Sequence, residues 1–171
     1  STVGELSRGI MVGEKPQDTS PSIKTRPVPP VSAQQAKFVR RQNYKVLTQA
    51  LEIAQTLQDN RAIAYANGYI AELYAEEKRY HEAIQLTRRA ISNAQRKRDY
   101  PELLYRWERQ LGGYFKKQGK FDSAIQAYQR AVHHLEAIRS GLQRGYRGVS
   151  QSVRETEGQV YFELADLLLQ K

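Results

Sequence analysis

The side chains that could do chemistry are few and poorly placed for catalysis. The chain has three histidines and no cysteine, so it offers no thiolate nucleophile, no disulfide and no cysteine-ligated zinc. His133 and His134 are adjacent, so on a helix they point to different faces and cannot share a metal as residues four apart can. Acidic pairs such as Glu76-Glu77 fall on helical turns that should be exposed, and the sequence contains no phosphate-binding glycine loop or Ser-His-Asp set. We therefore expect no enzymatic activity, no metal and no cofactor.

Cationic and aromatic side chains offer binding chemistry instead. Two segments with helical spacing each place several such residues on one face, at intervals of three and four. Guanidinium groups can clamp a carboxylate, and tyrosine rings supply apolar anchors at interfaces. The alternative interpretation of the same charges is a solvated helix face. The candidate partner-binding residues are Tyr65, Tyr69, Glu72, Arg106, Arg109, Gln110, Gly113, Lys116 and Lys117.

One of these candidates is a glycine inside a predicted helix. Glycine there is destabilising by roughly 0.5–1 kcal/mol relative to alanine, so Gly113 makes sense where another backbone must come close. The alternative is that Gly112 serves helix packing and Gly113 is incidental.

The charge balance bears on the kind of partner. The net charge of +9 is spread along the chain, which favours an acidic partner but is weaker evidence for nucleic acid than a clustered block would be. A second basic set could touch phosphate, although such residues more often complement helix C-termini or lie in solvated loops. Nucleic-acid binding is therefore the less favoured function. This second set comprises residues 95–100, Arg139, Arg144, Tyr146, Arg147 and Arg154.

Composition predicts an ordinary soluble domain. The chain has 171 residues, of which 40% are hydrophobic and 26% charged, enough to bury a core. No uncharged apolar run approaches the roughly 20 residues of a membrane-spanning helix. We expect no membrane association and a cytoplasmic location. A start at Ser1 instead of methionine leads us to expect a trimmed chain.

The first 31 residues differ from the rest. Five of the six prolines lie here, and proline disfavours helix both at its own position and at the preceding one. We expect residues 1–31 to form an extended arm or linker, and residues 32–171 to form a helical domain. The arm is expected to dock on that domain, either in the same chain or in a second copy.

Apolar residues at helical spacing then predict six helices. Ser32, with Gln35 three residues later, is the expected N-cap of the first helix, which continues to Asp59-Asn60. Pro101 suits the first turn of the fourth helix, and Gly119 is expected to end it in the left-handed conformation. The remaining helices are expected over about 61–77, 81–97, 122–140 and 152–170.

Two stretches of the sequence are nearly the same. The pairs related by a shift of 41 residues are Tyr80 and Phe121, Ala83 and Ala124, Ile84 and Ile125, and Ala90 and Ala131. The two aromatic residues are expected to wedge against the preceding helix, and the alanines to lie where helices approach too closely for a larger side chain. Each stretch follows an apolar residue, a small residue and an aromatic three further on, namely Ile70-Ala71-Tyr74 and Leu111-Gly112-Phe115.

This pattern resembles the tetratricopeptide repeat, an antiparallel helix pair that stacks into a right-handed solenoid. The resemblance covers about residues 36–171. It implies that the first helix of each pair lines a concave face that binds an extended peptide or a partner helix. The nine candidate residues would lie on that face, taking protein or peptide with acidic character.

The departures from the family pattern are also informative. Ala50 to Ala90 is 40 residues and Ala90 to Ala131 is 41, against about 34 in the standard repeat, as in long-repeat families similar to kinesin light chain. Tyr44, Leu47, Ala50 and Leu51 match a second helix that has no first helix before it. Leu164-Ala165-Leu168 match a first helix with no second helix after it. A truncated solenoid exposes apolar ends, so we expect a fragment and a possible homodimer through these ends or through the arm.

The closing segment, residues 131–171, also resembles the last repeat before the caspase-like CHAT protease domain. The sequence therefore predicts an all-α, tetratricopeptide-like protein-interaction module. The alternative function is a regulatory or substrate-docking segment of a larger CHAT-type protease.

Overall fold

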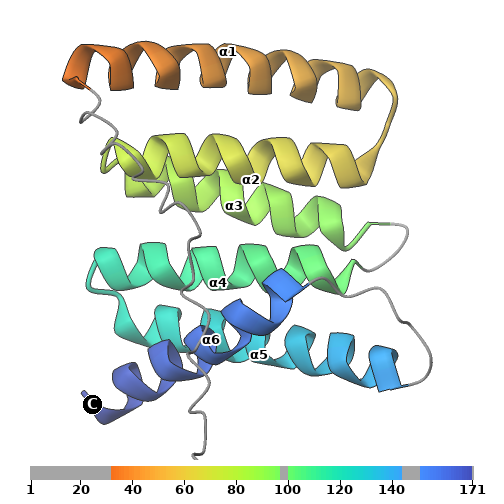
Figure 1. Cartoon of the computed structure of the whole chain (residues 1–171), viewed down its shortest axis with the longest axis vertical. Helices are drawn as coiled ribbons and strands as arrows, with labels where there is room; N and C mark the ends of the chain where they lie inside the picture. Colours follow the sequence, from red (N-terminus) through yellow and green to blue (C-terminus); the bar gives the residue numbers. More distant parts are fainter. Residues whose placement is uncertain (1–31, 97–99, 144–150, 171) are drawn as a thin grey trace, which may run out of the picture. The chain divides into compact units, whose positions relative to one another are not determined.

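The computed structural model describes residues 32–96, 100–143 and 151–170. The arm, residues 1–31, lies outside the described residues. The described part forms six helices, which confirms the all-α prediction for these residues (Figure 1). No helix among them is both long and apolar enough to cross a membrane. The helices are α1 (Ala33–Thr56), α2 (Asn60–Glu76), α3 (Tyr80–Ala94), α4 (Pro101–Lys117), α5 (Phe121–Gln143) and α6 (Gln151–Leu169).

Local signals set several helix ends where the sequence predicted them, but the expectation that the first helix continues to Asp59-Asn60 is wrong, because α1 ends at Thr56 and Asp59 caps α2. The Ser32 hydroxyl accepts from the Gln35 backbone N–H at 3.2 Å, and the Gln35 side chain accepts from Ser32 N–H at 2.9 Å, which confirms the capping box. Pro101 begins α4. Gly119 has φ +71° just after α4, as predicted, because glycine enters the left-handed region without a Cβ clash.

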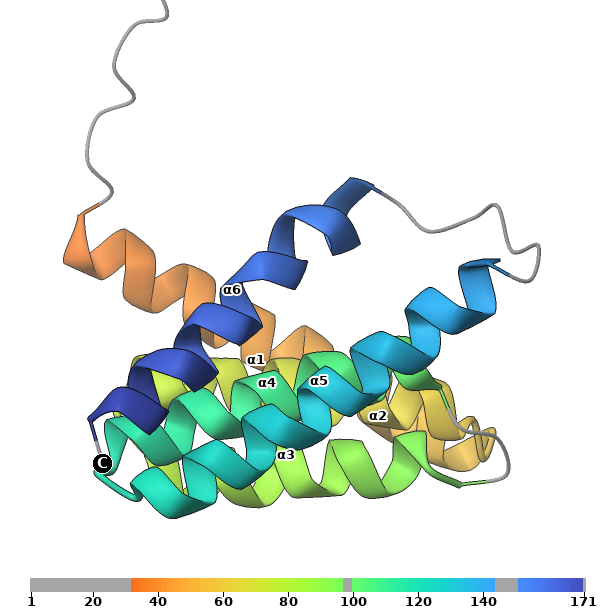
Figure 2. The same ribbon diagram turned by 90° about the horizontal axis from the view of Figure 1, so that it is seen from below.

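Each helix packs chiefly on its neighbours in the chain (Figures 1 and 2). The most extensive contacts join α2 to α3 and α4 to α5. Connections of three residues separate these helices, Glu77–Arg79 in the first pair and Gln118–Lys120 in the second. Between α4 and α5, the almost fully buried Glu108 accepts a hydrogen bond from Arg130 Nε at 2.8 Å.

Small residues lie at the helix contacts, as the repeated pattern predicted. Ala83, Ala90, Ala124 and Ala131 are all completely buried. The expectation of an aromatic wedge is wrong for Phe121, which is 49% exposed, because it is the first residue of α5 and lies at the edge of the packed surface.

The ring of Trp107 forms the contact between α2 and α4. Trp107 is fully buried, and a Cβ added to Gly68 would lie 2.5 Å from its ring. Gly68 therefore lets the α4 indole lie directly on the α2 backbone. Gly68 lies at helical spacing from Tyr65 and Tyr69, but the indole covers it.

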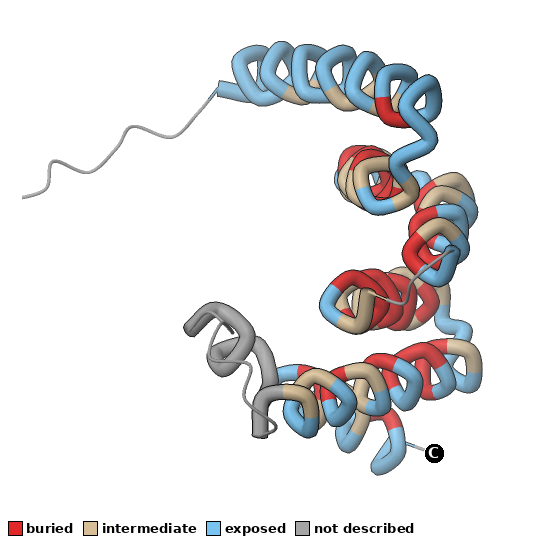
Figure 3. Tube along the Cα trace, turned by 90° about the vertical axis from the view of Figure 1, so that its right-hand side faces the viewer, coloured by how far each residue is buried: buried red, intermediate tan, exposed pale blue. Residues whose placement is uncertain are grey.

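The first helix has fewer buried residues than α2, α3, α4 or α5 (Figure 3). Ala54 is its one buried residue, whereas Val46 is 61% exposed and Leu57 is 71% exposed. Much of the apolar side of α1 therefore faces away from the core.

Candidate partner-binding site

In the predicted site, α2 contributes two stacked tyrosine rings. Tyr65 and Tyr69 stack with ring centres 6.2 Å apart, and both meet the ring of Trp107 edge-on, at 6.3 and 5.8 Å. Both tyrosines are half-buried. Because the buried indole supports their inner edges, the two rings present a fixed apolar surface to any group that approaches α2.

Arg106 on α4 contacts one of these rings. Its guanidinium carbon lies 4.7 Å from the Tyr69 ring centre, within cation–π range. Its Nη2 also forms an ion pair with Glu72 Oε1 at 3.5 Å. Burial raises the pKa of Glu72, and Arg106 only partly opposes that effect. The structure thus brings Tyr69, Glu72 and Arg106 together, as the sequence predicted for one face.

Two further cationic candidates contact α6. Arg109 Nη1 donates to Gln159 Oε1 at 3.1 Å, and Lys116 Nζ pairs with Asp166 Oδ2 at 2.9 Å. The hydrogen bond from Lys116 lowers the pKa of Asp166. Lys117, the neighbour of Lys116, is exposed. Two of the charges predicted to hold a partner therefore also connect α4 to α6.

Gln110 is used for packing between helices. Its Nε2 donates to the backbone oxygen of Gly68 and to Thr87 Oγ1, both at 3.1 Å. The side-chain amide of Gln110 on α4 therefore forms hydrogen bonds with both α2 and α3. Its placement leaves only the side-chain oxygen of Gln110 for a partner.

The two adjacent glycines differ in their surroundings. A Cβ on Gly112 would lie 3.0 Å from three atoms of the Tyr128 ring, a tighter contact than side chains normally make. A Cβ on Gly113 would lie 3.7 Å from the Tyr128 hydroxyl, an ordinary contact distance. Helix packing thus accounts for Gly112, and it does not account for Gly113.

We expect Gly113→Ala to raise the free energy of unfolding by about 0.5–1 kcal/mol, because alanine is the better helix former and its methyl group has room. Gly112→Ala is the matched variant and should be less stable than Gly113→Ala, since the Tyr128 ring would have to move. Thermal melting of the two proteins beside the wild type measures both effects. Equal stability of the two variants would contradict this explanation of Gly112.

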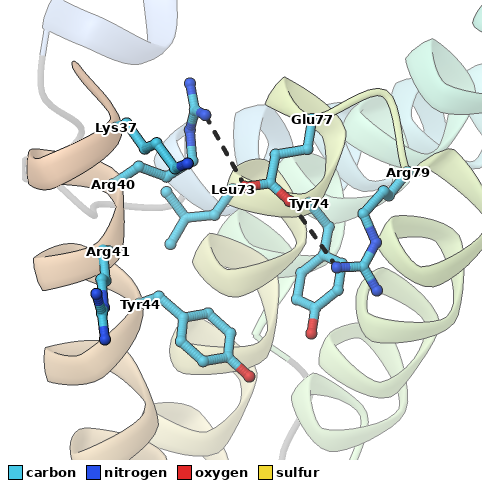
Figure 4. A pocket seen from close by; sticks show the side chains of 8 residues that line it. All are labelled: Lys37, Arg40, Arg41, Tyr44, Leu73, Tyr74, Glu77 and Arg79. Atoms are coloured by element: carbon cyan, nitrogen blue, oxygen red, sulfur yellow. Dashed lines mark ion pairs between the residues drawn. The ribbon is translucent and has the colours of Figure 1, made fainter. Parts of the chain in front are cut away.

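A surface hollow of about 410 Å³, which the sequence interpretation did not foresee, lies between α1 and the end of α2 (Figure 4). Glu77 pairs there with Arg40 at 3.9 Å and with Arg79 at 3.8 Å. Tyr44 meets Tyr74 edge-on at 6.1 Å. The sequence feature that could have indicated this hollow is the run of basic residues beside Tyr44 on α1. The Tyr44–Tyr74 contact joins α1 to α2, and the Arg40–Glu77 pair joins α1 to the connection between α2 and α3.

The basic set considered for nucleic acid falls mostly outside the described residues. Residues 97–99 and 144–150 are not described, and neither is the side chain of Arg154. Arg139 donates from Nη1 to the Tyr161 hydroxyl at 3.4 Å, so this member of the set contacts α6.

Within the described ranges, no group of three or more histidine or acidic side chains could hold a metal ion. The described site therefore consists of aromatic rings, one amide and paired charges on neighbouring helices. No protein-family model matches the chain, and neither does any curated protein.

Proposed function

We propose that this chain is a protein-interaction module of the tetratricopeptide type, which binds an acidic segment of a partner on the face formed by α2, α4 and α6. Buried small residues recur in both well-packed pairs, α2 with α3 and α4 with α5. Gly68 and Trp107 join the first helices of these pairs. These observations support an arrangement in which α2, α4 and α6 are equivalent first helices.

The observation that carries the binding proposal is the cluster of Tyr65, Tyr69 and Arg106. An arginine side chain that is 43% exposed lies over a half-buried tyrosine ring on the neighbouring helix. A guanidinium group has five N–H donors, and the loose ion pair with Glu72 engages few of them. An incoming carboxylate can take the remaining donors while an apolar group beside it covers the two tyrosine rings.

Selection of linear binders from a random peptide library tests this function with the full chain as bait. We expect the selected peptides to combine acidic residues with an aromatic or large aliphatic one. Their affinity should fall with added salt, because exposed charges are screened within about 8–10 Å at ordinary ionic strength. Arg106→Glu combined with Arg109→Glu should weaken the best peptide at least tenfold at low salt.

Arg89→Glu is the matched control, since Arg89 is exposed on α3, away from this face. It changes the net charge in the same direction as each site substitution and should reduce binding less than twofold. Circular dichroism should show the same helicity in all variants. Selected peptides without acidic residues, or equal binding by the double variant, would remove this face as the binding site.

A further inference from the structure

Among the residues that the structure describes, no helix covers an apolar stripe on α1. Val39, Val46 and Ile53 recur every seven residues, Leu57 follows four later, and all four are more than half exposed. Residues at this spacing share one side of a helix. Contiguous exposed apolar patches mark interaction surfaces, whereas single exposed apolar residues are normal.

The positions of α5 that match the stripe of α1 are buried. The repeated pattern aligns Asn43, Val46 and Ala50 of α1 with Ala124, Ala127 and Ala131 of α5. The three alanines of α5 are completely buried in the domain core, where α5 packs extensively on α4. The three α1 residues are exposed. The stripe therefore lies on the side of α1 that corresponds to a completely buried side of α5.

The last helix, α6, is exposed at positions where the matching residues of α4 are buried. Leu164-Ala165-Leu168 of α6 correspond to Leu111-Gly112-Phe115 of α4. Gly112 and Phe115 are buried, and Gly112 lies against the Tyr128 ring of α5. At the matching positions of α6, Ala165 is exposed and Leu168 is 50% exposed. In the described residues, α6 is thus a first helix without a second.

The two incomplete helices carry opposite charge. In sequence, α1 has four basic residues and one acidic residue, whereas α6 has four acidic residues and one basic residue. Opposite net charges steer an approach between α1 and α6. Two α1 helices would repel each other, and so would two α6 helices.

We propose that copies of this chain associate head to tail, with α6 of one copy packed on the exposed stripe of α1 of the next. The contact supplies α1 with its missing first helix and α6 with its missing second helix. The two surfaces differ, so the contact is heterologous and does not close on itself in a dimer. Each added copy leaves one free α1 and one free α6. This association does not depend on the peptide-binding function proposed for the α2, α4 and α6 face.

Sedimentation velocity of the full chain over a wide concentration range tests the association. We expect the average mass to rise with concentration past the dimer, and the rise to weaken at high salt. Val46→Asp in α1 and Ala165→Asp in α6 should each hold the protein as a monomer. Both residues are exposed in the single chain, so helicity by circular dichroism should not change. Ser92→Asp, at an exposed position on α3, is the control and should associate like the wild type.

A mixture of the two variants distinguishes this contact from a symmetric one. The Val46→Asp protein keeps an intact α6, and the Ala165→Asp protein keeps an intact α1. An equimolar mixture should therefore form a discrete dimer and nothing larger. A wild type that stays monomeric at every concentration overturns the proposal, as does association that the mixture fails to restore. A wild-type dimer that Val46→Asp alone disrupts would assign the stripe to contact between two α1 helices instead.

Discussion

Replacing Trp107 with alanine is expected to lower the free energy of unfolding by about 3–5 kcal/mol, the usual range for removing a fully buried large aromatic residue. The indole is completely buried, lies on Gly68 and supports both tyrosines of the candidate site. Its loss would leave a cavity between α2 and α4. Chemical denaturation followed by circular dichroism measures the change. Trp107→Phe is the milder comparison, because Nε1 has no hydrogen-bond acceptor among the described residues and no such bond is lost.

Gly68, which lies against the Trp107 ring, supplies the control for this prediction. Gly68→Ala should destabilise the wild type, because the new methyl group would meet the indole ring at 2.5 Å. In the Trp107→Ala protein the same substitution should stabilise by up to about 1 kcal/mol, since only the helix preference of alanine remains. A change of sign between the two backgrounds identifies the direct contact. Additive effects would show that Gly68 and Trp107 do not pack on each other in solution.

Enlarging the small residues at the helix contacts should have the second largest effect. Ala83→Leu and Ala124→Leu are each expected to destabilise by about 1–3 kcal/mol, because both sites are completely filled and overpacking forces the helices apart. Thermal melting measures the loss. Ala137→Leu, at an exposed position of α5, is the matched control and should change stability by less than about 0.5 kcal/mol. A wild-type melting temperature for either core variant would contradict the repeat register.

Three helix boundaries were predictable because local chemistry determines them. The capping box at Ser32, Pro101 in the first turn of α4 and Gly119 after it act through bonds and dihedral angles within a few residues. The buried alanines were predictable for a related reason. A small residue repeated at a fixed interval in an otherwise amphipathic helix indicates a close helix contact, and Ala83 and Ala124 are both fully buried.

The contacts across helices could not be predicted, since they depend on how far one helix slides along another. Nothing in the local sequence distinguishes Glu108 from an exposed glutamate, yet α5 covers it and Arg130 pairs with it. The helical position of Gln110 does not reveal that its amide nitrogen donates hydrogen bonds to both α2 and α3. The helical position of Gly68 does not reveal that a ring 39 residues later in the chain lies over it.

In the candidate site, the arrangement of neighbours on one helix follows from spacing, but the contacts between helices do not. Helical spacing alone put Tyr65 and Tyr69 on one face, and the structure stacks them. The pairing of Arg109 and Lys116 with α6 involves residues 50 positions away. No rule of spacing connects groups so distant, so the sequence predicted the charges of this face and not their partners.

Packing between chain neighbours also governs how the helices form and come apart. The contacts of each helix are chiefly with those next to it in sequence, so little chain has to be closed into loops before contacts form, and folding should be fast. A helix packed on both sides, such as α3, can open only by disrupting two contact surfaces. By contrast α1, packed on α2, can detach by itself at a smaller cost in free energy. Backbone amide protons in α1 should therefore exchange with solvent sooner than those of α3, and unfolding should start at the ends of the helical array and move inward.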